Sequence, residues 1–283
     1  MKSLLQFIGR QDWIRLGVRD RLIRFFYNPD QVDSFEFEMD FFSHKYNGNL
    51  NCYIDWSAYF YGAYEKETIY LYRDIVKNKI DPVFLDIGAN IGHHSLFMST
   101  CCAQVHSFEP YAKVSDKLKQ KISKNQVKNI TLHPVGLGEK NEELPFYAPK
   151  GSNTGTGSFI SSYSSNNQEC GVLKIVDADE YISNLRPSQI DLIKIDVEGY
   201  EKNVLKGLVN ILEKYKPTVV MEFSSTTKHS FSGLDEILSL FPRSYKVKQI
   251  VSNTPRFLFF NSPNYKLVDF DFNTAGGDII FLP

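Results

Sequence analysis

The chain has 283 residues, 42% of them hydrophobic, so it is long and apolar enough to bury a full α/β core. Its formal net charge of −1 offers no bulk attraction to nucleic acid or to an anionic membrane, and we expect no nucleic-acid partner. No apolar run approaches the ~20 residues of a membrane span, and the N-terminus lacks the apolar region and cleavage site of an exported protein.

Residues 1–27 combine large apolar side chains with arginines at helix-like spacing. The apolar set is Leu4, Leu5, Phe7, Ile8, Trp13, Ile14, Leu16, Val18, Leu22, Ile23, Phe25 and Phe26, and the arginines are Arg10, Arg15, Arg19, Arg21 and Arg24. A basic amphipathic helix of this kind can rest on a membrane surface, here the inner membrane. A helix packed across the domain, or between two subunits of a homo-oligomer, explains the same pattern, and we favour packing.

Residues 31–75 are rich in aromatic side chains, from Phe35 to Tyr72. Such a run either lines a sugar-binding or acceptor site by stacking or caps the sheet of the following domain, and both interpretations are open. Residues Glu65 to Lys79 are predicted to form a helix that ends before Asp81-Pro82. We therefore divide the chain into a helical and aromatic extension at 1–75 and a ligand-binding domain at 76–283.

From Val83 onward, short apolar strands alternate with helices, which indicates a parallel sheet covered on both faces. The predicted strands are Val83–Asp86, Gln104–Glu109, Ile130–Val135, Ile190–Asp196 and Thr218–Phe223, and the predicted helices are Gly92–Thr100, Ala112–Asn125, Glu201–Glu213 and Gly233–Phe241. Two β-like segments, Tyr245–Val251 and Asp278–Leu282, close the chain and suit an antiparallel last strand inserted at the sheet edge. We expect an α/β fold with a mostly parallel, seven-stranded, Rossmann-like sheet.

Two smaller features complete the organisation. The stretch 148–170 is a polar loop rich in glycine and serine, inserted in the α/β domain, and we favour a lid over a flexible linker. The four cysteines are Cys52, Cys101, Cys102 and Cys170, and none forms a C-x-x-C pair. This usage favours reduced thiols over disulfides or a zinc site, as in a cytoplasmic protein.

The segment Asp86-Ile87-Gly88-Ala89-Asn90-Ile91-Gly92 directly follows a buried strand. Gly88 and Gly92 allow a sharp turn and a close approach of backbone to ligand. The helix that begins near Gly92 offers free N–H groups to an anion, and Asp86 can accept from a ligand ammonium group or its waters. The segment therefore predicts a nucleotide-like binding turn.

Glu109, at the end of the second strand, lies about twenty residues beyond this turn, where an acid reaches ribose hydroxyls in dinucleotide-type folds. Pro110 then stops the strand. A dinucleotide fingerprint requires glycine at the position of Asn90, whose side chain would crowd a pyrophosphate. S-adenosylmethionine has no pyrophosphate, so the turn favours S-adenosylmethionine over NAD as the cofactor.

The segments DIGANIGHHS, FEP, PVGLGE and IDLIKIDVEGYEKNVLKG resemble the FkbM family of S-adenosylmethionine-dependent methyltransferases, in that family's order and spacing. The resemblance runs from Tyr53 to the final strand. It implies a class I methyltransferase fold and O-methylation of a hydroxyl on a sugar or a natural product. The first 30 residues and the 148–170 loop lie outside it.

The resemblance assigns cofactor contacts to Asp86, Gly88, Ala89, Asn90, Gly92 and Ser95, and to Glu109 with Pro110. It places Val135 and Gly136 beside adenine, although the family usually has alanine at Gly136. Lys194, Asp196, Glu198, Gly199 and Glu201 match the family's second motif, and Glu222 matches an acid at the end of the fifth strand.

Methyl transfer to a hydroxyl requires the oxygen to be held ~3 Å from the methyl carbon and a group that takes its proton. Asp196 faces the expected sulfonium position, with Lys194 on the same side of the strand. Either Asp196 acts as general base or positioning group, or Asp196 with Glu198 or Glu222 holds Mg²⁺ against a vicinal diol. A buried Lys194–Glu222 ion pair is the structural alternative. His229, after the fifth strand, is a further candidate base, as are His93 and His94.

Three functions follow from these features. The first is an O-methyltransferase acting on a carbohydrate hydroxyl. The second is a methyltransferase for a lipid, peptide or polyketide acceptor. The third is a membrane-associated binding module that keeps the fold without turnover.

Overall fold

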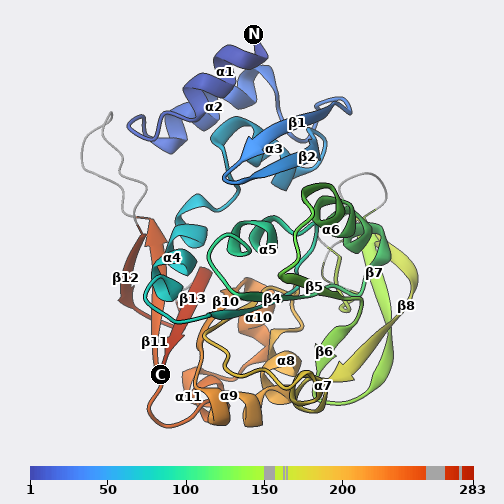
Figure 1. The fold of residues 1–283 in the computed structure, drawn as a ribbon, viewed down its shortest axis with the longest axis vertical. Coiled ribbons are helices and arrows are strands. Elements are labelled where there is room, and N and C mark those ends of the chain that lie inside the picture. The colour runs from blue at the N-terminus through green and yellow to red at the C-terminus, as the bar shows by residue number, and fades with distance from the viewer. Residues whose placement is uncertain (150–156, 162, 164, 253–264, 274–275) are drawn as a thin grey trace.

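The computed structural model describes residues 1–149, 157–161, 163, 165–252, 265–273 and 276–283. A central sheet of eight strands has the order β12-β11-β13-β10-β9-β3-β4-β5 (Figure 1). Its strands are β3 (Val83–Ile87), β4 (Gln104–Phe108), β5 (Ile130–His133), β9 (Leu192–Ile195), β10 (Thr218–Phe223), β11 (Lys246–Ser252), β12 (Tyr265–Asp269) and β13 (Gly277–Leu282). The helices of this part are α4 (Lys66–Val76), α5 (His93–Met98), α6 (Ala112–Asn125), α7 (Ala178–Leu185), α8 (Glu201–Gly207), α9 (Val209–Tyr215), α10 (Ser225–Ser230) and α11 (Leu234–Ser239).

The sheet confirms the expected Rossmann-like, mostly parallel architecture, with eight strands where seven were expected. Strands β5, β4, β3, β9 and β10 are parallel neighbours, and the order reverses between β3 and β9. In open α/β sheets, ligands bind beside the carboxyl ends of the strands at such a reversal. The loops after β3 and β9 contain both of the motifs singled out in the sequence.

The last strand differs in position from the sequence expectation. β13 is antiparallel, as predicted, but it lies between β10 and β11 rather than at the sheet edge. Its Ile279, Ile280 and Phe281 are completely buried, which an interior position requires. The edge is formed by β12, an eighth strand that pairs with β11.

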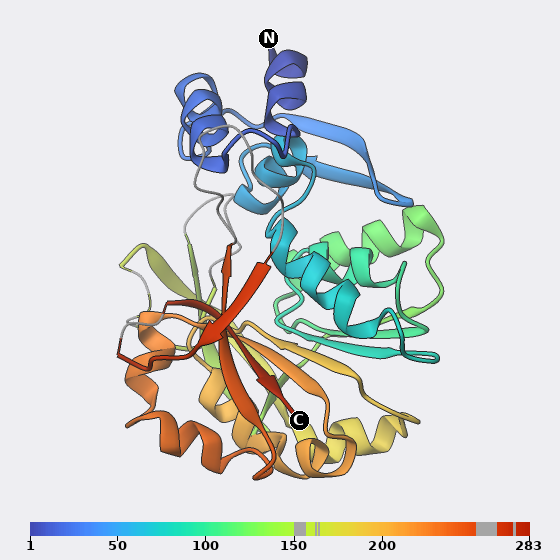
Figure 2. The ribbon, with the colours of Figure 1, turned by 90° about the vertical axis from the view of Figure 1, so that its left-hand side faces the viewer.

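Hydrophobic clusters cover both faces of the sheet. One face packs against α7, α8, α9 and α11, with Val204, Leu212 and Ile237 fully buried. The other packs against α4 and α5, with Ile69 and Leu96 fully buried. The expected boundary after residue 75 cuts through α4, whose contacts with this face place it with the sheet (Figure 2).

The N-terminal residues form a cap at one end of the sheet, at the top of Figure 1. It consists of α1 (Lys2–Gly9), α2 (Leu16–Phe26), the hairpin β1 (Glu36–Phe41) and β2 (His44–Asn49), and α3 (Tyr53–Tyr61). Residues 1–27 therefore form two helices rather than one. Their buried side chains, Leu5 and Ile23, pack on Trp56 and Phe60 of α3. The prediction that this segment packs against the rest of the protein is therefore confirmed for the side of the helices that faces α3, and for that side only.

A second, three-stranded sheet has the order β6-β8-β7 and lies beside α8. It contains β6 (Gly136–Gly138), β7 (Glu142–Pro149) and β8 (Asn167–Asp177). The predicted loop at 148–170 thus overlaps the ends of two strands, and its residues 150–156, 162 and 164 lie outside the described residues. Phe159, in the described part of this loop, packs against the hydrophobic cluster on one face of the central sheet.

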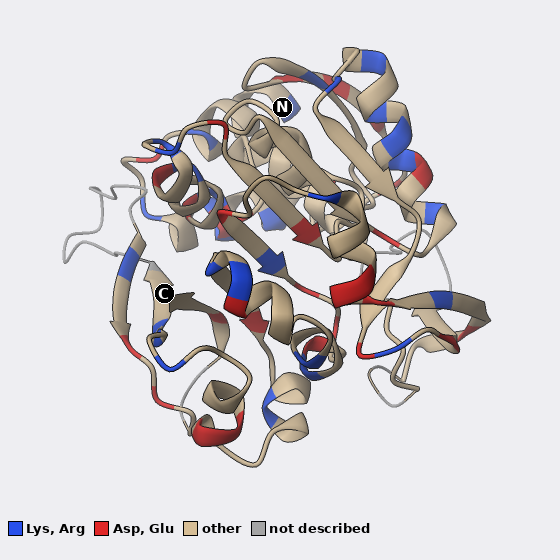
Figure 3. Cartoon of the chain, turned by 60° about the horizontal axis from the view of Figure 1, so that its bottom comes forward, with Lys and Arg blue, Asp and Glu red and all other residues tan. Residues whose placement is uncertain are grey.

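All four cysteines are free thiols, as expected. Within the described residues, no helix combines the length and apolar character needed to cross a membrane. Acidic and basic positions are interspersed over the ribbon in the view of Figure 3, in keeping with the near-zero net charge.

Candidate active site

The turn after β3 is shaped by its glycines and by contacts to the neighbouring strand. The N–H groups of Gly88 and Ala89 both donate to the Phe108 carbonyl oxygen, 3.0 Å away in each case. Gly88, Asn90 and Gly92 all have φ between 50° and 82°, a region that L-residues rarely adopt. A Cβ on Gly92 would lie 2.2 Å from Leu118 on α6, so the glycine also lets α6 approach.

Asp86 is completely buried below this turn. Its Oδ2 accepts from the Ser95 hydroxyl at 2.5 Å, and Ser95 also contacts Ser107 at 2.7 Å. No hydrogen-bond donor among the described residues reaches Asp86 Oδ1, although the Lys194 ammonium lies 3.4 Å from it. A buried carboxylate oxygen without a donor has capacity left for a ligand or an ordered water.

Glu109 lies at the end of β4, where the sequence places it beside the turn. Its carboxylate accepts the N–H of Asn90 at 3.0 Å and that of Tyr111 at 2.9 Å. Burial raises the pKa of Glu109 to about 7. Each oxygen keeps a second lone pair, with which the group can accept from a hydroxyl.

Two adjoining cavities meet at Gly88, Asn90, Asp196 and Glu198. The first, of 60 Å³, is called the cofactor-side cavity here. It is bounded by Glu109 and Pro110 and by three aromatic rings, Tyr111, Phe146 and Phe159. The rings of Tyr111 and Phe146 are 4.9 Å apart, and those of Phe146 and Phe159 are 5.2 Å apart. Rings so arranged suit a flat heterocycle.

Val135 and Gly136, predicted beside adenine, lie one layer away from this cavity. Val135 belongs to the hydrophobic core, and a Cβ on Gly136 would lie 2.5 Å from Ile175 and 3.6 Å from Pro110. Neither lines the cavity. Their contact with adenine stays a prediction.

The second cavity, of 210 Å³, is called the acceptor-side cavity here and opens toward the cap. Asp30, Tyr53 and Tyr64 line it from the cap, and His94, Asp196 and Glu198 line it from the sheet. The aromatic segment therefore packs against the sheet and also lines a cavity; that the cavity holds an acceptor stays a prediction. Trp56, Phe60 and Tyr61 are buried in the cap, and Phe41, Tyr46 and Tyr72 are buried against the central sheet. Tyr53 and Tyr64 line the cavity.

Lys194 connects the turn to the second motif. Its ammonium lies 3.4 Å from Asp86 and 3.2 Å from Asp196, and it donates to the Gly88 carbonyl oxygen at 3.1 Å. Burial alone would lower the pKa of Lys194, but Asp196, Asp86 and Glu65 together raise it above its ordinary value. The alternative of a Lys194–Glu222 ion pair is wrong, because Lys194 forms its ion pairs with Asp86 and Asp196 instead.

Glu201, on α8, holds the backbone that carries Asp196 and Glu198. It is completely buried. Its Oε1 accepts the N–H groups of Val197 and Gly199, each at 3.1 Å, and its Oε2 accepts the Thr227 hydroxyl at 2.8 Å. The turn needs this support, since Glu198 has a φ of 53° and Gly199 a φ of 99°.

We expect Glu201→Gln to lower kcat about tenfold and to cost about 1–3 kcal/mol of stability, because an amide cannot accept all three donors. Urea unfolding and steady-state kinetics would measure both. Glu213→Gln, at an exposed position on α9, is the matched control. A loss of stability with kcat intact would show that the turn does not orient reacting groups.

Several carboxyl groups crowd around Asp196. Glu222 on β10 is the register partner of Asp278 on β13. Burial, followed by repulsion from neighbouring acids, raises the pKa of Glu222 to about 9 and those of Glu198 and Asp278 to about 8. The Tyr163 hydroxyl donates to Glu198, and the Thr68 hydroxyl donates to Asp278 at 3.2 Å.

The raised pKa values give a stability prediction. A carboxyl whose pKa is higher in the folded than in the unfolded state binds more protons when folded, so its stabilisation is lost as pH rises through the folded pKa. The melting temperature should therefore fall as pH rises from about 5, and level off above about 9, where these groups are ionised in both states. Glu222→Gln should flatten that fall and Glu213→Gln should not. Identical slopes in thermal scans of all three proteins would refute the assignment.

The histidines lie in different settings. His93 is buried, and its Nε2 accepts the Tyr64 N–H at 3.1 Å, so it anchors the cap and its buried ring has a lowered pKa. His94 faces Glu65, 3.4 Å from Nε2 to the carboxylate. His229 is exposed on α10, its Nδ1 lies 2.6 Å from the Ser225 carbonyl oxygen, and it lines neither cavity. Its role as a base stays a prediction, and Asp196 and Glu198, which line both cavities, are better placed.

Asp196, Glu198 and Glu222 were also predicted as metal ligands. Within the described part of the chain, no group of three or more His, Cys, Asp or Glu side chains is arranged to hold a metal ion. The Mg²⁺ site gains no support from this arrangement and stays a prediction that EDTA treatment would test.

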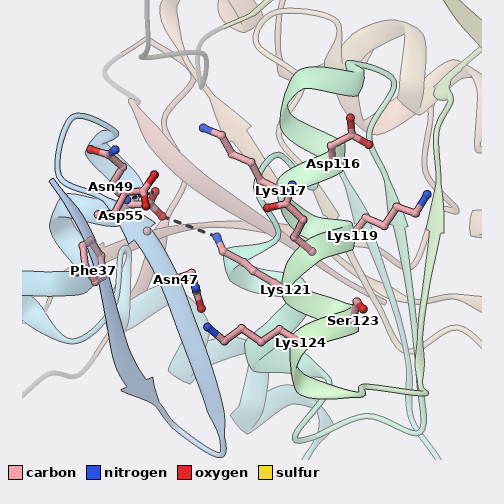
Figure 4. A pocket seen from close by; sticks show the side chains of 13 residues that line it. Phe37, Asn47, Asn49, Asp55, Asp116, Lys117, Lys119, Lys121, Ser123 and Lys124 are labelled. Atoms are coloured by element: carbon pink, nitrogen blue, oxygen red, sulfur yellow. Dashed lines mark hydrogen bonds and ion pairs between the residues drawn. The ribbon is translucent and has the colours of Figure 1, made fainter. Parts of the chain in front are cut away.

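A larger hollow, of 780 Å³, lies elsewhere, between α6 and the β1–β2 hairpin (Figure 4). Two buried charged groups in its wall form an ion pair, with the Lys121 ammonium 3.7 Å from the Asp55 carboxylate. The same carboxylate accepts a hydrogen bond from the Tyr46 hydroxyl at 2.8 Å. Near its rim, Lys124 pairs with Glu38 at 2.5 Å. These contacts fasten the cap to α6, away from the turn after β3.

Sequence reasoning missed several residues of this site, including Tyr111, Phe146 and the following four. Glu65 and Asp278 reach it from α4 and β13, Tyr64 from the cap, and Tyr163 from the segment before β8. None of them lies in a motif. The signals present in the sequence were the density of aromatic residues near Tyr64 and the predicted lid at 148–170, which contains Tyr163.

Residues 86–247 match the family model described as the methyltransferase FkbM domain. The chain is 29% identical over 140 residues to the hexuronic acid methyltransferase AglP of Haloferax volcanii, covering 50% of this chain and 55% of that protein. It is 27% identical over 218 residues to the AMB antimetabolite synthetase AmbE of Pseudomonas aeruginosa, covering 61% of this chain and 10% of that protein. The chain thus spans about half, or much less, of these curated relatives.

Among solved structures, a methyltransferase FkbM from Methylobacillus flagellatus KT is 17% identical, with a TM-score of 0.43. The comparison covers 71% of this chain and 43% of that one.

Proposed function

This chain belongs to the FkbM family of methyltransferases, and we propose that it transfers the methyl group of S-adenosylmethionine to a hydroxyl oxygen of a carbohydrate acceptor. The observation that carries the proposal is the meeting of two cavities at Asp196 and Glu198. One is bounded by aromatic rings and the ribose acid, and the other opens toward the cap with polar and aromatic walls. Donor and acceptor can therefore approach the same carboxylates from opposite sides.

The residues present fit the cofactor. Glu109 has lone pairs left for ribose hydroxyls, and the rings of Tyr111, Phe146 and Phe159 suit adenine. The donor-free Oδ1 of Asp86 supports a role for this carboxylate in binding the methionine end, through a water or a small shift of the turn. When bound, the cofactor supplies an electrophilic methyl group on a positively charged sulfur.

Asp196 and Glu198 have different roles toward the acceptor: Asp196 positions its hydroxyl, and Glu198 takes the proton. The ion pair with Lys194, at 3.2 Å, orients the Asp196 carboxylate toward the point where the cavities meet. Its negative charge there favours a sulfonium and can accept a hydrogen bond from the acceptor hydroxyl. This is the positioning role considered for Asp196 in the sequence.

Glu198 is the better-matched base. It lines both cavities, and its pKa of about 8 is near the pH at which such an enzyme works. With its carboxylate ionised, Glu198 would take the proton of an acceptor hydroxyl held where the two cavities meet. Glu222 has a pKa of about 9, so it is protonated at neutral pH, and it lines neither cavity; its catalytic role stays a prediction.

The walls of the acceptor-side cavity favour a sugar. Tyr53 and Tyr64 offer ring faces, and Asp30 and His94 offer hydrogen-bonding groups for hydroxyls. The likeness to a hexuronic acid methyltransferase supports the same class of acceptor. Lipid, peptide or polyketide acceptors are the second candidate, and a binding module without turnover is the third.

Cofactor binding is tested first. S-adenosylmethionine or S-adenosylhomocysteine should raise the melting temperature of the purified chain, and Asp86→Ala should abolish the rise. Ser239→Ala, on α11 and far from the turn in sequence, is the control. No rise at millimolar cofactor would contradict the proposal at its first step.

The acceptor is tested next with methyl-labelled S-adenosylmethionine. Panels of uronic acid glycosides, neutral glycosides, lipid extracts and peptides should show label in the glycoside fraction. Label found only in lipid or peptide would favour a methyltransferase for a lipid, peptide or polyketide acceptor. If no acceptor led to formation of S-adenosylhomocysteine, a binding module without turnover would be favoured.

A further inference from the structure

The outer side of the helix pair α1 and α2 exposes a concentration of large apolar side chains. Nine of the fifteen strongly exposed large hydrophobic side chains among the described residues lie in the first 26 residues. Phe7 is 64% exposed, Trp13 53% and Phe25 81%. We propose that this surface, called the outer face here, docks the protein on an anionic lipid membrane.

The two helices present the outer face together. On α1, Leu5 and Gly9 are buried, whereas Leu4 and Phe7 are exposed. A Cβ on Gly9 would lie 2.4 Å from the Phe60 carbonyl oxygen of α3 and 2.9 Å from Ile23 of α2, so the inner sides of both helices are tightly packed. The side chains that remain outside have no cover in the described structure.

On α2, Arg19 and Ile23 are buried, whereas Val18, Leu22 and Phe25 are exposed. These three recur at the spacing of one helix face. Both apolar stripes therefore point away from the cap core, on helices that contact each other. An exposed apolar surface of this extent marks an interaction site.

The charges of the outer face fit an anionic surface. Residues 1–27 contain six basic and two acidic side chains, although the whole chain has a net charge of −1. Both acids are neutralised internally: Asp12 pairs with Arg19 and Lys66, and Asp20 pairs with Arg24. Arg15 and Arg21 are exposed and have no ion pair within the described residues.

This combination favours lipid over the other occupants. A second copy would bring the unpaired arginines of two identical faces together, which costs Coulomb energy. Nucleic acid would leave the exposed Phe7, Trp13 and Phe25 facing phosphates. A membrane interface accepts both kinds of group, since apolar and aromatic side chains enter the acyl boundary while arginines meet lipid phosphates.

The outer face also borders the site. Leu16 and Gly17 of α2 line a cavity of 450 Å³ whose inner wall contains Tyr53 and Tyr64, and these two tyrosines also line the acceptor-side cavity. Docking through α2 therefore holds the cap-side openings next to the head groups. The docking itself does not depend on the reaction that the site performs.

Vesicle flotation of the full chain tests the proposal. The protein should float with vesicles of phosphatidylglycerol and phosphatidylcholine, and much less with phosphatidylcholine alone or at high salt. The double variant Phe7→Ser/Phe25→Ser and the double variant Arg15→Glu/Arg21→Glu should each lower partitioning on the order of tenfold or more. All four positions are exposed, so these changes leave the cap core intact.

The controls are Ile80→Ser, at a side chain 84% exposed on the sheet side, and Arg243→Glu, at an exposed position after α11. Both should float like the unaltered chain, and circular dichroism should be the same for all variants. Binding that fails with anionic vesicles, or that survives both double substitutions, would overturn the proposal. So would a dimer in ultracentrifugation that Phe7→Ser/Phe25→Ser disrupts while vesicles are not bound, because a second copy would then cover the face.

Discussion

Replacing Glu198 with glutamine is expected to lower kcat on the order of a hundredfold or more, because the group that takes the hydroxyl proton is lost. The pH profile gives the sharper signature. With Glu198 present, kcat/KM should rise through an apparent pKa of about 8, since only the ionised carboxylate can act. Glu198→Gln should remove that rise while the cofactor-induced increase in melting temperature is retained.

Tyr163 offers an independent check on the same base. Its hydroxyl donates to Glu198 and favours the ionised form. Tyr163→Phe should therefore move the rise in kcat/KM to higher pH without abolishing activity. A profile that is unchanged in both variants would remove Glu198 from the mechanism and return the role of base to Asp196.

Gly88→Ala is expected to cost about 2–4 kcal/mol of stability and to abolish the response to cofactor. The residue has a φ of 82°, and an added Cβ would lie 1.8 Å from the Asp196 carbonyl oxygen. The ends of β3 and β9 would have to separate, and both cavities meet between those ends. Thermal melts with and without S-adenosylhomocysteine measure both effects.

Gly17→Ala is the matched control for this substitution. Gly17 lies in α2, has no heavy atom within 4 Å of an added Cβ, and should become slightly more stable as alanine. If Gly88→Ala behaved like Gly17→Ala, the close contact of the turn with β9 would not be required for folding or for binding.

The central strands and the motifs that follow them could be predicted from the sequence because these strands are buried. Strands such as Val83–Ile87 are buried on both faces, so they appear in the sequence as short apolar runs between helices. The turn at Gly88 and the acid at Glu109 follow such strands at fixed distances. Their placement at one edge of the sheet then follows from the parallel order of β3, β4 and β9.

The parts that could not be predicted depend on long-range pairing or on exposed strands. β8 is exposed over much of its length, so residues 167–170 read as part of a polar loop. Asp278 enters the site because β13 pairs with β10, which no local pattern specifies. Glu65 does so because α4 packs on α5 and brings it beside His94.

The central claim is that donor and acceptor meet at Asp196 and Glu198. The most direct measurement is mass spectrometry of a uronic acid glycoside incubated with the protein and methyl-labelled S-adenosylmethionine, compared with the same reaction with Glu198→Gln. We predict a labelled methyl ether on a sugar hydroxyl with the unaltered chain and a strongly reduced yield with the variant. Equal yields from the two proteins, or label on no acceptor at all, would contradict the account.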